Sequence, residues 1–167
     1  MTAPFRVEVL GHTHAREAFS CGVQALDQYL VTRASQDVRR RMSACYVAVE
    51  IDSQRLAGYY TLAAGGVPLN ELPPGLTQRL PRYPSVPVAR LGRLAVDKAF
   101  HGRKLGAALL ADAAVRAARS EVAVHALIVD AKDEGAAAFY RHHGFEPMGG
   151  QGRQLFVPLQ RFNQAPS

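Results

Sequence analysis

Cysteine is scarce in this sequence, and that scarcity excludes one class of protein. Among the 167 residues there are two cysteines, Cys21 and Cys45, and neither belongs to a C-x-x-C pair. Two isolated thiols supply no disulfide framework of the kind that small secreted domains need. We therefore expect both cysteines to be reduced residues of the core, where free cysteine is commonly found.

Long apolar runs and several site motifs are also missing. No apolar run reaches the roughly 18 residues that a membrane-spanning helix needs. Residues 1–6 lack the apolar core of a signal peptide, so we expect a cytoplasmic protein with no membrane partner. The absence of a G-x-x-x-x-G-K-S/T sequence argues against a nucleotide-hydrolysing P-loop. The histidine pairs at 12/14 and 142/143 lack accompanying Cys or acidic ligands, so we expect no metal.

Positive charge, by contrast, is in excess. The formal net charge is +6 at pH 7, which favours polyanionic partners and speeds their capture. Nucleic acid, phosphorylated cofactors and acidic proteins all satisfy this condition, and the charge alone does not choose among them.

The pattern of apolar residues predicts one α/β domain over residues 1–167. Strands are expected where apolar residues alternate or run together, and helices where they recur at helical spacing. The predicted strands are 6–10, 45–51, 55–65, 88–96, 122–129 and 153–159, and the predicted helices are 25–42, 103–119 and 133–142. Strands that alternate with helices in this way favour a mixed sheet with helices on both faces.

Proline is concentrated in one connection, residues 67–87, which holds six of the ten prolines. Proline blocks regular helix and central strand. A connection of this length inside a compact domain is usually functional or mobile. A short helical turn is expected from Leu76 to Leu80.

The stretch from Leu94 to Gly106 predicts a phosphate site. A strand ends there, a turn that contains glycine follows, and a helix begins, so unpaired backbone N–H groups and the helix dipole point outwards. Gly102 and Gly106 permit close approach of backbone and ligand, and Arg103 and Lys104 add charge for a pyrophosphate. A plain strand–turn–helix connection is the alternative interpretation.

A second stretch follows the next predicted strand and has the pattern D-x-x-A-x-x-F-Y-x-x-x-G-F. Its members are Asp133, Ala136, Phe139, Tyr140, Gly144 and Phe145. Together the two stretches resemble the GNAT acyltransferase superfamily over about residues 88–147. The resemblance implies a GNAT fold, in which a mixed central sheet with splayed strands is flanked by helices and holds acetyl-CoA in the gap.

The resemblance also implies roles for individual residues. The cofactor would be held by the strand backbone, by the turn and by the start of the second helix, at Leu94, Ala95, Val96, His101, Gly102, Arg103, Lys104, Leu105, Gly106, Asp133, Ala136 and Phe139. Tyr140 stands where the family often has the general acid for the departing thiolate; the alternative is a tyrosine that only packs. The family loop usually reads Gln/Arg-x-x-Gly-x-Gly/Ala, so His101 and Lys104 are departures from it.

The N-terminal half resembles one subgroup, the acetyltransferase toxins of type II toxin–antitoxin modules. The similar segments are Phe19–Gly22, residues 26–30, the Arg-rich helix, Gly58–Leu62 and Leu91–Val96. The subgroup implies acetylation of the α-amine of aminoacyl-tRNA, a homodimer and a ribbon-helix-helix antitoxin. Two alternatives remain: a GNAT enzyme acting on a small amine or a protein N-terminus, and a non-catalytic module that binds coenzyme A or RNA.

Basic residues of the same half are candidates for contacts with tRNA phosphates. They are Arg33, Arg39, Arg40, Arg41 and Arg93. For the four helix residues the alternative is an ordinary solvated face, and Arg93 either meets a phosphate or is solvated. An α-amine substrate suits a site without an evident base, since roughly a tenth of α-amines are neutral at pH 7, against about one lysine in a few thousand.

Overall fold

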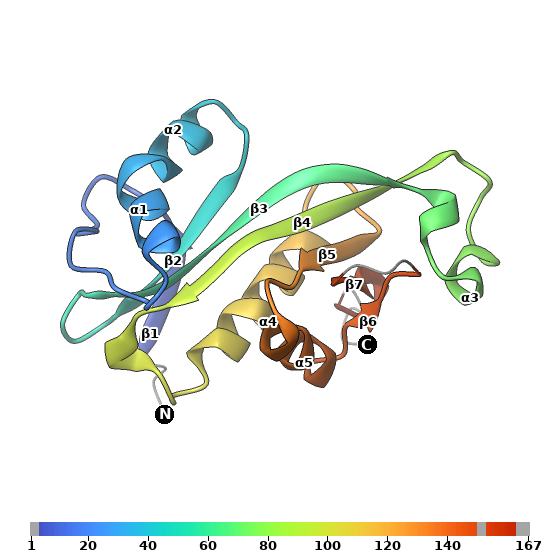
Figure 1. Cartoon of the computed structure of the whole chain (residues 1–167). Helices are drawn as coiled ribbons and strands as arrows, with labels where there is room; N and C mark the ends of the chain where they lie inside the picture. Colours follow the sequence, from blue (N-terminus) through green and yellow to red (C-terminus); the bar gives the residue numbers. More distant parts are fainter. Residues whose placement is uncertain (1–3, 150–152, 163–167) are drawn as a thin grey trace, which may run out of the picture. The chain divides into compact units, whose positions relative to one another are not determined.

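A computed structural model describes residues 4–149 and 153–162 of the chain (Figure 1). Its strands are β1 Phe5–Val9, β2 Ala44–Glu50, β3 Leu56–Pro68, β4 Ser85–Val96, β5 Ala126–Asp130, β6 Glu146–Pro147 and β7 Gln154–Pro158. Its helices are α1 Gln24–Thr32, α2 Ala34–Arg39, α3 Pro74–Thr77, α4 Leu105–Ala118 and α5 Glu134–His142, with 3-10 turns η1 Leu69–Glu71, η2 Lys98–Phe100 and η3 Leu159–Phe162.

The strands form one mixed sheet, in the order β1-β2-β3-β4-β5-β7-β6. The pairs β1/β2, β2/β3, β5/β7 and β6/β7 are antiparallel, whereas β4 and β5 run parallel. The predicted α/β class with a mixed sheet and flanking helices is thereby confirmed. Within the described residues, no helix has both the length and the apolar character that a bilayer crossing requires.

By its internal contacts the chain divides into two compact units. The first holds residues 1–63 and 92–113, and the second holds residues 64–91 and 114–167. Strands β3 and β4 and helix α4 contribute residues to both units. The single domain over residues 1–167 stays a prediction.

In the first unit, successive residues of β3 point to opposite faces of the sheet, as strand geometry requires. Tyr59 is fully buried among residues of α1, α2 and β2, and its hydroxyl donates to the Leu26 carbonyl at 2.7 Å. Gly58 and Tyr60 face the other way. A side chain at 58 would meet Leu109 of α4 at 2.8 Å, and the Tyr60 hydroxyl donates to Asp112 of the same helix. Helices α1 and α4 therefore cover opposite faces of this part of the sheet.

The predicted helix over 25–42 is wrong in one respect, because it is two helices. Arg33 has φ −125° and ψ −28°, outside the helical region. Its N–H closes α1 on the Tyr29 carbonyl at 2.9 Å, and its own carbonyl accepts from Asp37 in α2 at 3.0 Å. The change of direction comes directly before Ala34, which is completely buried in the core together with Tyr29 and Leu30.

In the second unit, β5 is buried on both faces, as its apolar run predicts. Ala126 and Ile128 lie in a cluster with Val67, Val88 and other apolar side chains. Leu127 and Val129, which point to the other face, are also buried. The strand begins four residues later than predicted, and a two-residue strand, β6, was not predicted.

The proline-rich connection is shorter than its proline content predicts. Strand β3 continues to Pro68 and β4 begins at Ser85, so the segment between the strands is residues 69–84, which includes η1 and α3. Pro87 lies within β4, where its carbonyl accepts from the His125 N–H at 2.8 Å and no N–H of its own is required. Leu72, Leu76 and Leu80 pack on the apolar cluster of the second unit, which anchors the connection on the sheet.

Candidate functional site

The turn between β4 and α4 is held by Asp97, which is 4 % exposed. Its carboxylate accepts from the Ser20 N–H and from the Ala99 N–H, both at 2.9 Å. Its own N–H donates to the Ala57 carbonyl of β3 at 2.8 Å. A buried carboxylate that accepts two backbone N–H groups fixes the direction in which the chain leaves the strand.

Phe100 adds an apolar anchor to the same turn. Its ring is buried, and the guanidinium carbons of Arg55 and Arg103 each lie 5.3 Å from the ring centroid. Arg103 also lies 3.4 Å from a carboxylate oxygen of Glu50. The Arg103 side chain, predicted to serve a pyrophosphate, is thus held beside the turn by a ring and a carboxylate.

The last residues of β4 direct alternate backbone groups away from β3. The Asp97 N–H points towards β3, so the carbonyl of Val96, in the same peptide plane, points away from it. The His101 imidazole donates to that carbonyl at 2.8 Å. One of the two backbone groups expected to meet the pantetheine arm at Val96 is therefore engaged by His101. Strand β5 pairs with β4 only from Val88 to Leu91, which ends well before Val96.

Two residues of the loop have left-handed backbone conformations, Gly102 at φ 79° and Lys104 at φ 62°. Arg103 between them does not. Alternation of this kind turns successive N–H groups to one side, which makes a concave anion site. The first intrahelical bond of α4 runs from Ala108 to the Lys104 carbonyl at 3.1 Å, so the N–H groups of 105–107 precede the helical ladder.

The family's preference for glycine at the position of Lys104 has a physical reason in this geometry. Glycine occupies positive φ without the steric cost that a Cβ introduces. This chain adopts the glycine conformation with a lysine. At Gly102 a Cβ would meet nothing within 4 Å, so the protein leaves open space beside the loop at this position.

Helix α5 carries the second predicted stretch. Asp133 is its N-cap, and its carboxylate accepts from the Ala136 N–H at 2.8 Å. The helix ends where Gly144 takes φ 94°. The carboxylate predicted to contact the cofactor therefore has a structural task, which the D-x-x-A spacing reflects.

Tyr140 is 9 % exposed and is held by ring packing. Its ring centroid lies 5.4 Å from that of Phe139 and 5.6 Å from that of Phe145. Burial raises the pKa of the Tyr140 hydroxyl. That hydroxyl forms no hydrogen bond with the described part of the chain. It is not fully enclosed either, because the only fully buried side-chain polar atom without a partner among the described residues is Nε2 of His125. The Tyr140 hydroxyl therefore carries its proton, has no hydrogen-bond partner in the described chain and is accessible.

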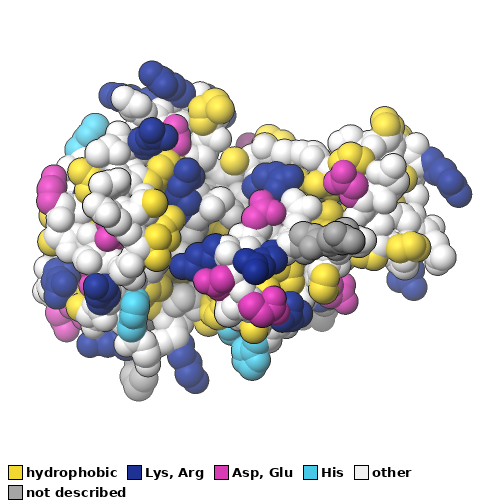
Figure 2. Space-filling view, in the orientation of Figure 1, with side chains coloured by type: hydrophobic (Ala, Val, Ile, Leu, Met, Phe, Trp, Pro, Cys, Tyr) yellow, Lys and Arg dark blue, Asp and Glu magenta, His cyan; other side chains and the backbone are white. Residues whose placement is uncertain are grey.

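The candidate tRNA contacts fall into two groups. Arg33, Arg39, Arg40 and Arg41 are exposed, and Lys and Arg side chains gather over α2 in Figure 2. None of the four forms an ion pair with a described residue. Arg93 differs, because its guanidinium carbon lies 3.5 Å from the centroid of the Tyr29 ring.

Asp97 was not singled out from the sequence, although it lies inside the predicted loop. The available signal was an acidic residue directly after an apolar strand and two residues before Ala99, which is the spacing of a local side-chain cap. No group of three or more His, Cys, Asp or Glu in the described residues has the arrangement of a metal site.

Comparison with known families decides the class of protein. The model of the acetyltransferase (GNAT) domain matches residues 41–147, which includes both the loop after β4 and Tyr140. The chain belongs to the GNAT acetyltransferase family. Its resemblance to that family is confirmed, and it is an acetyltransferase.

Several relatives of this GNAT chain have been described. It is 38 % identical over 131 residues to the tRNA-acetylating toxin of Mycobacterium tuberculosis (strain ATCC 25618 / H37Rv), which covers 77 % of this chain and 76 % of the toxin. A crystal structure of a tyrosine-to-phenylalanine mutant of KacT is similar with a TM-score of 0.87 and 28 % identity, over 96 % of this chain and 98 % of KacT.

Structures of AtaT are similar as well. AtaT complexed with acetyl-methionyl-tRNAfMet has a TM-score of 0.86 and 30 % identity, over 94 % of this chain and 96 % of AtaT. AtaTR has been solved bound with acetyl-CoA, with a TM-score of 0.81, 30 % identity and coverage of 95 % and 96 %. A tyrosine-to-phenylalanine mutant of AtaT has been solved bound to the C-terminus of the antitoxin AtaR.

Proposed function

We propose that this chain transfers the acetyl group of acetyl-CoA to the α-amine of aminoacyl-tRNA and so blocks translation. The observation that carries the proposal is the similarity to a tRNA-acetylating toxin over 77 % of this chain and to AtaT with acetyl-methionyl-tRNAfMet over 94 % of it. The exposed arginines at positions 33 and 39–41, which have no ion-pair partner among the described residues, support a polyanionic substrate.

The loop after β4 fits a bound pyrophosphate. Its backbone is left-handed at Gly102 and Lys104 but not at Arg103 between them, which turns successive N–H groups to one side. A Cβ at Gly102 would meet nothing within 4 Å, and Arg103 and Lys104 supply positive charge. Acetyl-CoA supplies an acetyl thioester, which is activated towards amines. Leu94 and Val96 would offer backbone groups to the pantetheine arm, and His101, Leu105 and Gly106 would complete the cradle.

Tyr140 is the proposed general acid. Burial keeps the pKa of its hydroxyl above the ordinary value, so the oxygen retains its proton throughout the neutral range and can give it to the departing sulfur. No other described side chain holds that hydroxyl, which leaves it free to donate to the sulfur. The α-amine needs no strong base, because a tenth or so of it is already neutral at pH 7.

We infer further that the chain works in the cytoplasm as a homodimer and is restrained by a ribbon-helix-helix antitoxin. The antitoxin AtaR bound to AtaT supports a protein partner of this kind. Light scattering of the purified chain tests the dimer. Co-expression with the gene directly upstream tests the antitoxin, because a cognate partner is expected to relieve growth arrest.

The proposal is tested by acetyl transfer from labelled acetyl-CoA to a pool of charged tRNA. The same pool after deacylation, a panel of small amines and a peptide with a free N-terminus are run in parallel. Label is expected on charged tRNA and absent from the deacylated pool. Label on a small amine or on the peptide, with charged tRNA unmodified, contradicts the proposed substrate.

A further inference from the structure

The proline-rich segment of the second unit surrounds a cavity that the acetyl-transfer chemistry does not use. The cavity has a volume of about 640 Å³ and lies within residues 68–84. Its polar lining consists of Asn70, Thr77, Gln78, Arg82 and Tyr83, and prolines and leucines complete it. Its lining contains no acidic residue. A volume of several hundred cubic ångströms suits a small ligand or one unit of a polymer.

Tyr83 stands out among the aromatic residues of the described chain. It is 66 % exposed, and it is the one aromatic among the large apolar residues that remain exposed. Pro84 follows it directly, and the Pro84 carbonyl accepts from the Leu69 N–H at 3.1 Å. The ring is thus carried by a segment whose backbone is restricted by proline and tied across the loop, so little conformational freedom is lost when a ligand stacks on it.

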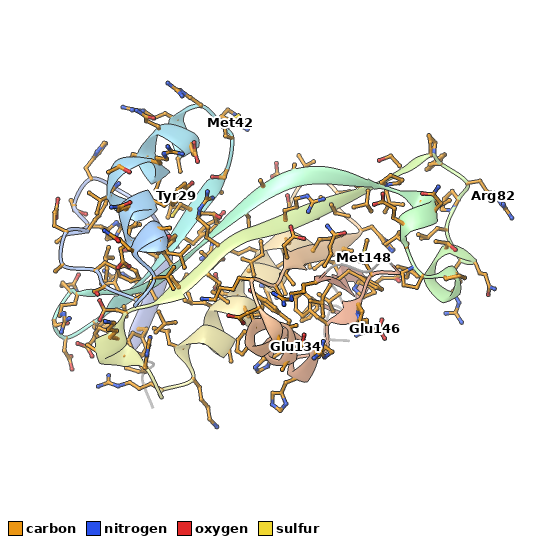
Figure 3. The ribbon with its side chains drawn as sticks, in the orientation of Figure 1. Tyr29, Met42, Arg82, Glu134, Glu146 and Met148 are labelled. Carbon is orange, nitrogen blue, oxygen red and sulfur yellow. The ribbon has the colours of Figure 1, made fainter. Side chains whose placement is uncertain are left out.

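Arginines occur in the same proline-rich segment as this ring. Arg82 precedes it and projects from the segment between α3 and β4 (Figure 3). Arg79, from the same segment, and Arg161 line a neighbouring cavity of about 690 Å³ that likewise has no acidic residue in its lining. Arg79 and Arg82 are exposed, and neither forms an ion pair with a described residue.

An exposed aromatic ring, amide side chains and unpaired guanidinium groups match the chemistry of unpaired nucleic acid. Bases of single strands stack on aromatic rings, and arginines follow the phosphates. Asn and Gln can hydrogen-bond to the edges of a splayed base. A base-paired helix cannot offer a base face to Tyr83, since its bases are stacked on one another.

We propose that this cavity binds an unpaired nucleotide of the tRNA substrate, with its base on Tyr83 and a phosphate on Arg82. The inference rests on the proposed function for the identity of the RNA. Asn70 and Gln78 contact the base edge. The site uses none of the arginines at positions 33 and 39–41, and it gives the enzyme a means to distinguish single-stranded from paired regions of its substrate.

Direct binding tests the site without any acetyl transfer. A fluorescein-labelled unpaired RNA of about eight nucleotides, and the same RNA annealed to its complement, are titrated with the full chain by fluorescence anisotropy. Tyr83→Ala is expected to weaken binding of the unpaired RNA by about 5- to 100-fold. Tyr83→Phe, which keeps the stacking surface, is expected to retain wild-type affinity. Binding of the duplex is expected to stay unchanged in both variants.

Arg82→Gln provides a second variant with a different signature. Loss of one phosphate contact lowers the slope of log affinity against log salt by about 0.7 for a single strand. Arg119→Gln is the matched control, because Arg119 is exposed and lines neither cavity; its slope is expected to equal that of the wild type.

Three results overturn the proposal. The first is no measurable binding of unpaired RNA by the wild type. The second is wild-type affinity in Tyr83→Ala together with a wild-type salt slope in Arg82→Gln. The third is an equal loss of RNA affinity in Tyr83→Ala and Tyr83→Phe. The last result indicates that Tyr83 holds the RNA through its hydroxyl and not by stacking of its ring.

Acetylation kinetics separate this proposal from the proposed function. If charged tRNA is the substrate, Tyr83→Ala is expected to raise KM for charged tRNA by the same factor and to leave kcat unchanged. Wild-type KM in that variant overturns the nucleotide site and leaves the substrate assignment intact. Charged tRNA unmodified by the wild type refutes the substrate assignment, while the binding measurements still decide the nucleotide site.

Discussion

The two units hold their functional residues by different means. In the first unit, polar bonds fix the loop after β4: Asp97 accepts two backbone N–H groups, and His101 donates to the Val96 carbonyl. In the second unit, apolar rings fix Tyr140, whose hydroxyl has no partner in the described chain. A site that binds a ligand through its backbone can be held in place by hydrogen bonds from side chains. A proton donor must instead be positioned by a part of its side chain that does not react.

This difference explains which residues can vary. In the loop, Lys104 adopts the positive φ at which the family usually has glycine, and the His101 side chain braces the backbone, so both departures from the family pattern are compatible with the loop. At position 140 the proposed proton transfer requires the hydroxyl itself, and the ring must also fill its site. The contrast leads to four predictions, ordered from the largest expected effect to the smallest.

The first prediction concerns the hydroxyl of Tyr140. Tyr140→Phe keeps the ring packing and removes the proton, so kcat is expected to fall by about 10²–10⁴. KM for both substrates and the unfolding midpoint are expected to change little. Single-turnover acetylation and thermal denaturation check this. A variant as fast as the wild type would mean that the tyrosine only packs.

The second prediction concerns the anchor of the loop. Asp97→Ala leaves the N–H groups of Ser20 and Ala99 without their acceptor, which is expected to cost about 3 kcal/mol of unfolding free energy. Affinity for acetyl-CoA is expected to fall with it, since the loop loses its direction. Denaturant titration and calorimetry measure the two quantities. Asp52→Ala, at an exposed aspartate, is the matched control and is expected to be neutral within about 0.5 kcal/mol.

The third prediction concerns the basic face of the first unit. Replacement of Arg39, Arg40 and Arg41 by alanine is expected to weaken tRNA binding by tenfold or more and to lower the salt slope by about two to three. Acetylation of a small amine, if the enzyme accepts one, is expected to be unaffected. Binding titrations at several salt concentrations check this, and an unchanged slope would identify α2 as an ordinary solvated face.

The fourth prediction concerns backbone conformation in the loop. Lys104→Gly removes the cost of a side chain at positive φ and is expected to stabilise the protein by about 1 kcal/mol. Gly102→Ala introduces that cost and is expected to destabilise by a similar amount, although a Cβ there meets nothing. Gly75→Ala is the control, because Gly75 has equal space without a positive φ. A neutral Gly102→Ala would contradict the left-handed loop.

Much of this architecture follows from local patterns in the sequence. The Ala- and Leu-rich stretch predicts α4, and the D-x-x-A spacing predicts α5 because Asp133 caps it. The break at Arg33 could not be predicted locally, since arginine and alanine both tolerate helix and the helical spacing of apolar residues continues through it. Strand β4 begins before Pro87 and continues through it, because the Pro87 carbonyl accepts from the His125 N–H and no N–H of its own is required. This bond depends on a neighbouring segment that is remote in sequence.

The candidate site divides in the same way. The loop after β4 and Tyr140 follow from motifs with fixed spacing. The role of Asp97 could not be predicted in full, because one of its partners, Ser20, is remote in sequence. The stacking of Arg93 on Tyr29 is likewise a contact between distant segments, whereas the sequence left Arg93 between a phosphate contact and a solvated side chain.

Mass spectrometry of the 3′ ends of charged tRNA tests the central claim most directly. Charged tRNA is incubated with acetyl-CoA and either the wild type or Tyr140→Phe, and nuclease digestion then releases the terminal aminoacyl-adenosine. N-acetylaminoacyl-adenosine is expected with the wild type and is expected to be nearly absent with the variant over the same time. The account would be contradicted if the α-amine of the aminoacyl-adenosine stayed free in both samples while the same enzyme acetylated a small amine at full rate.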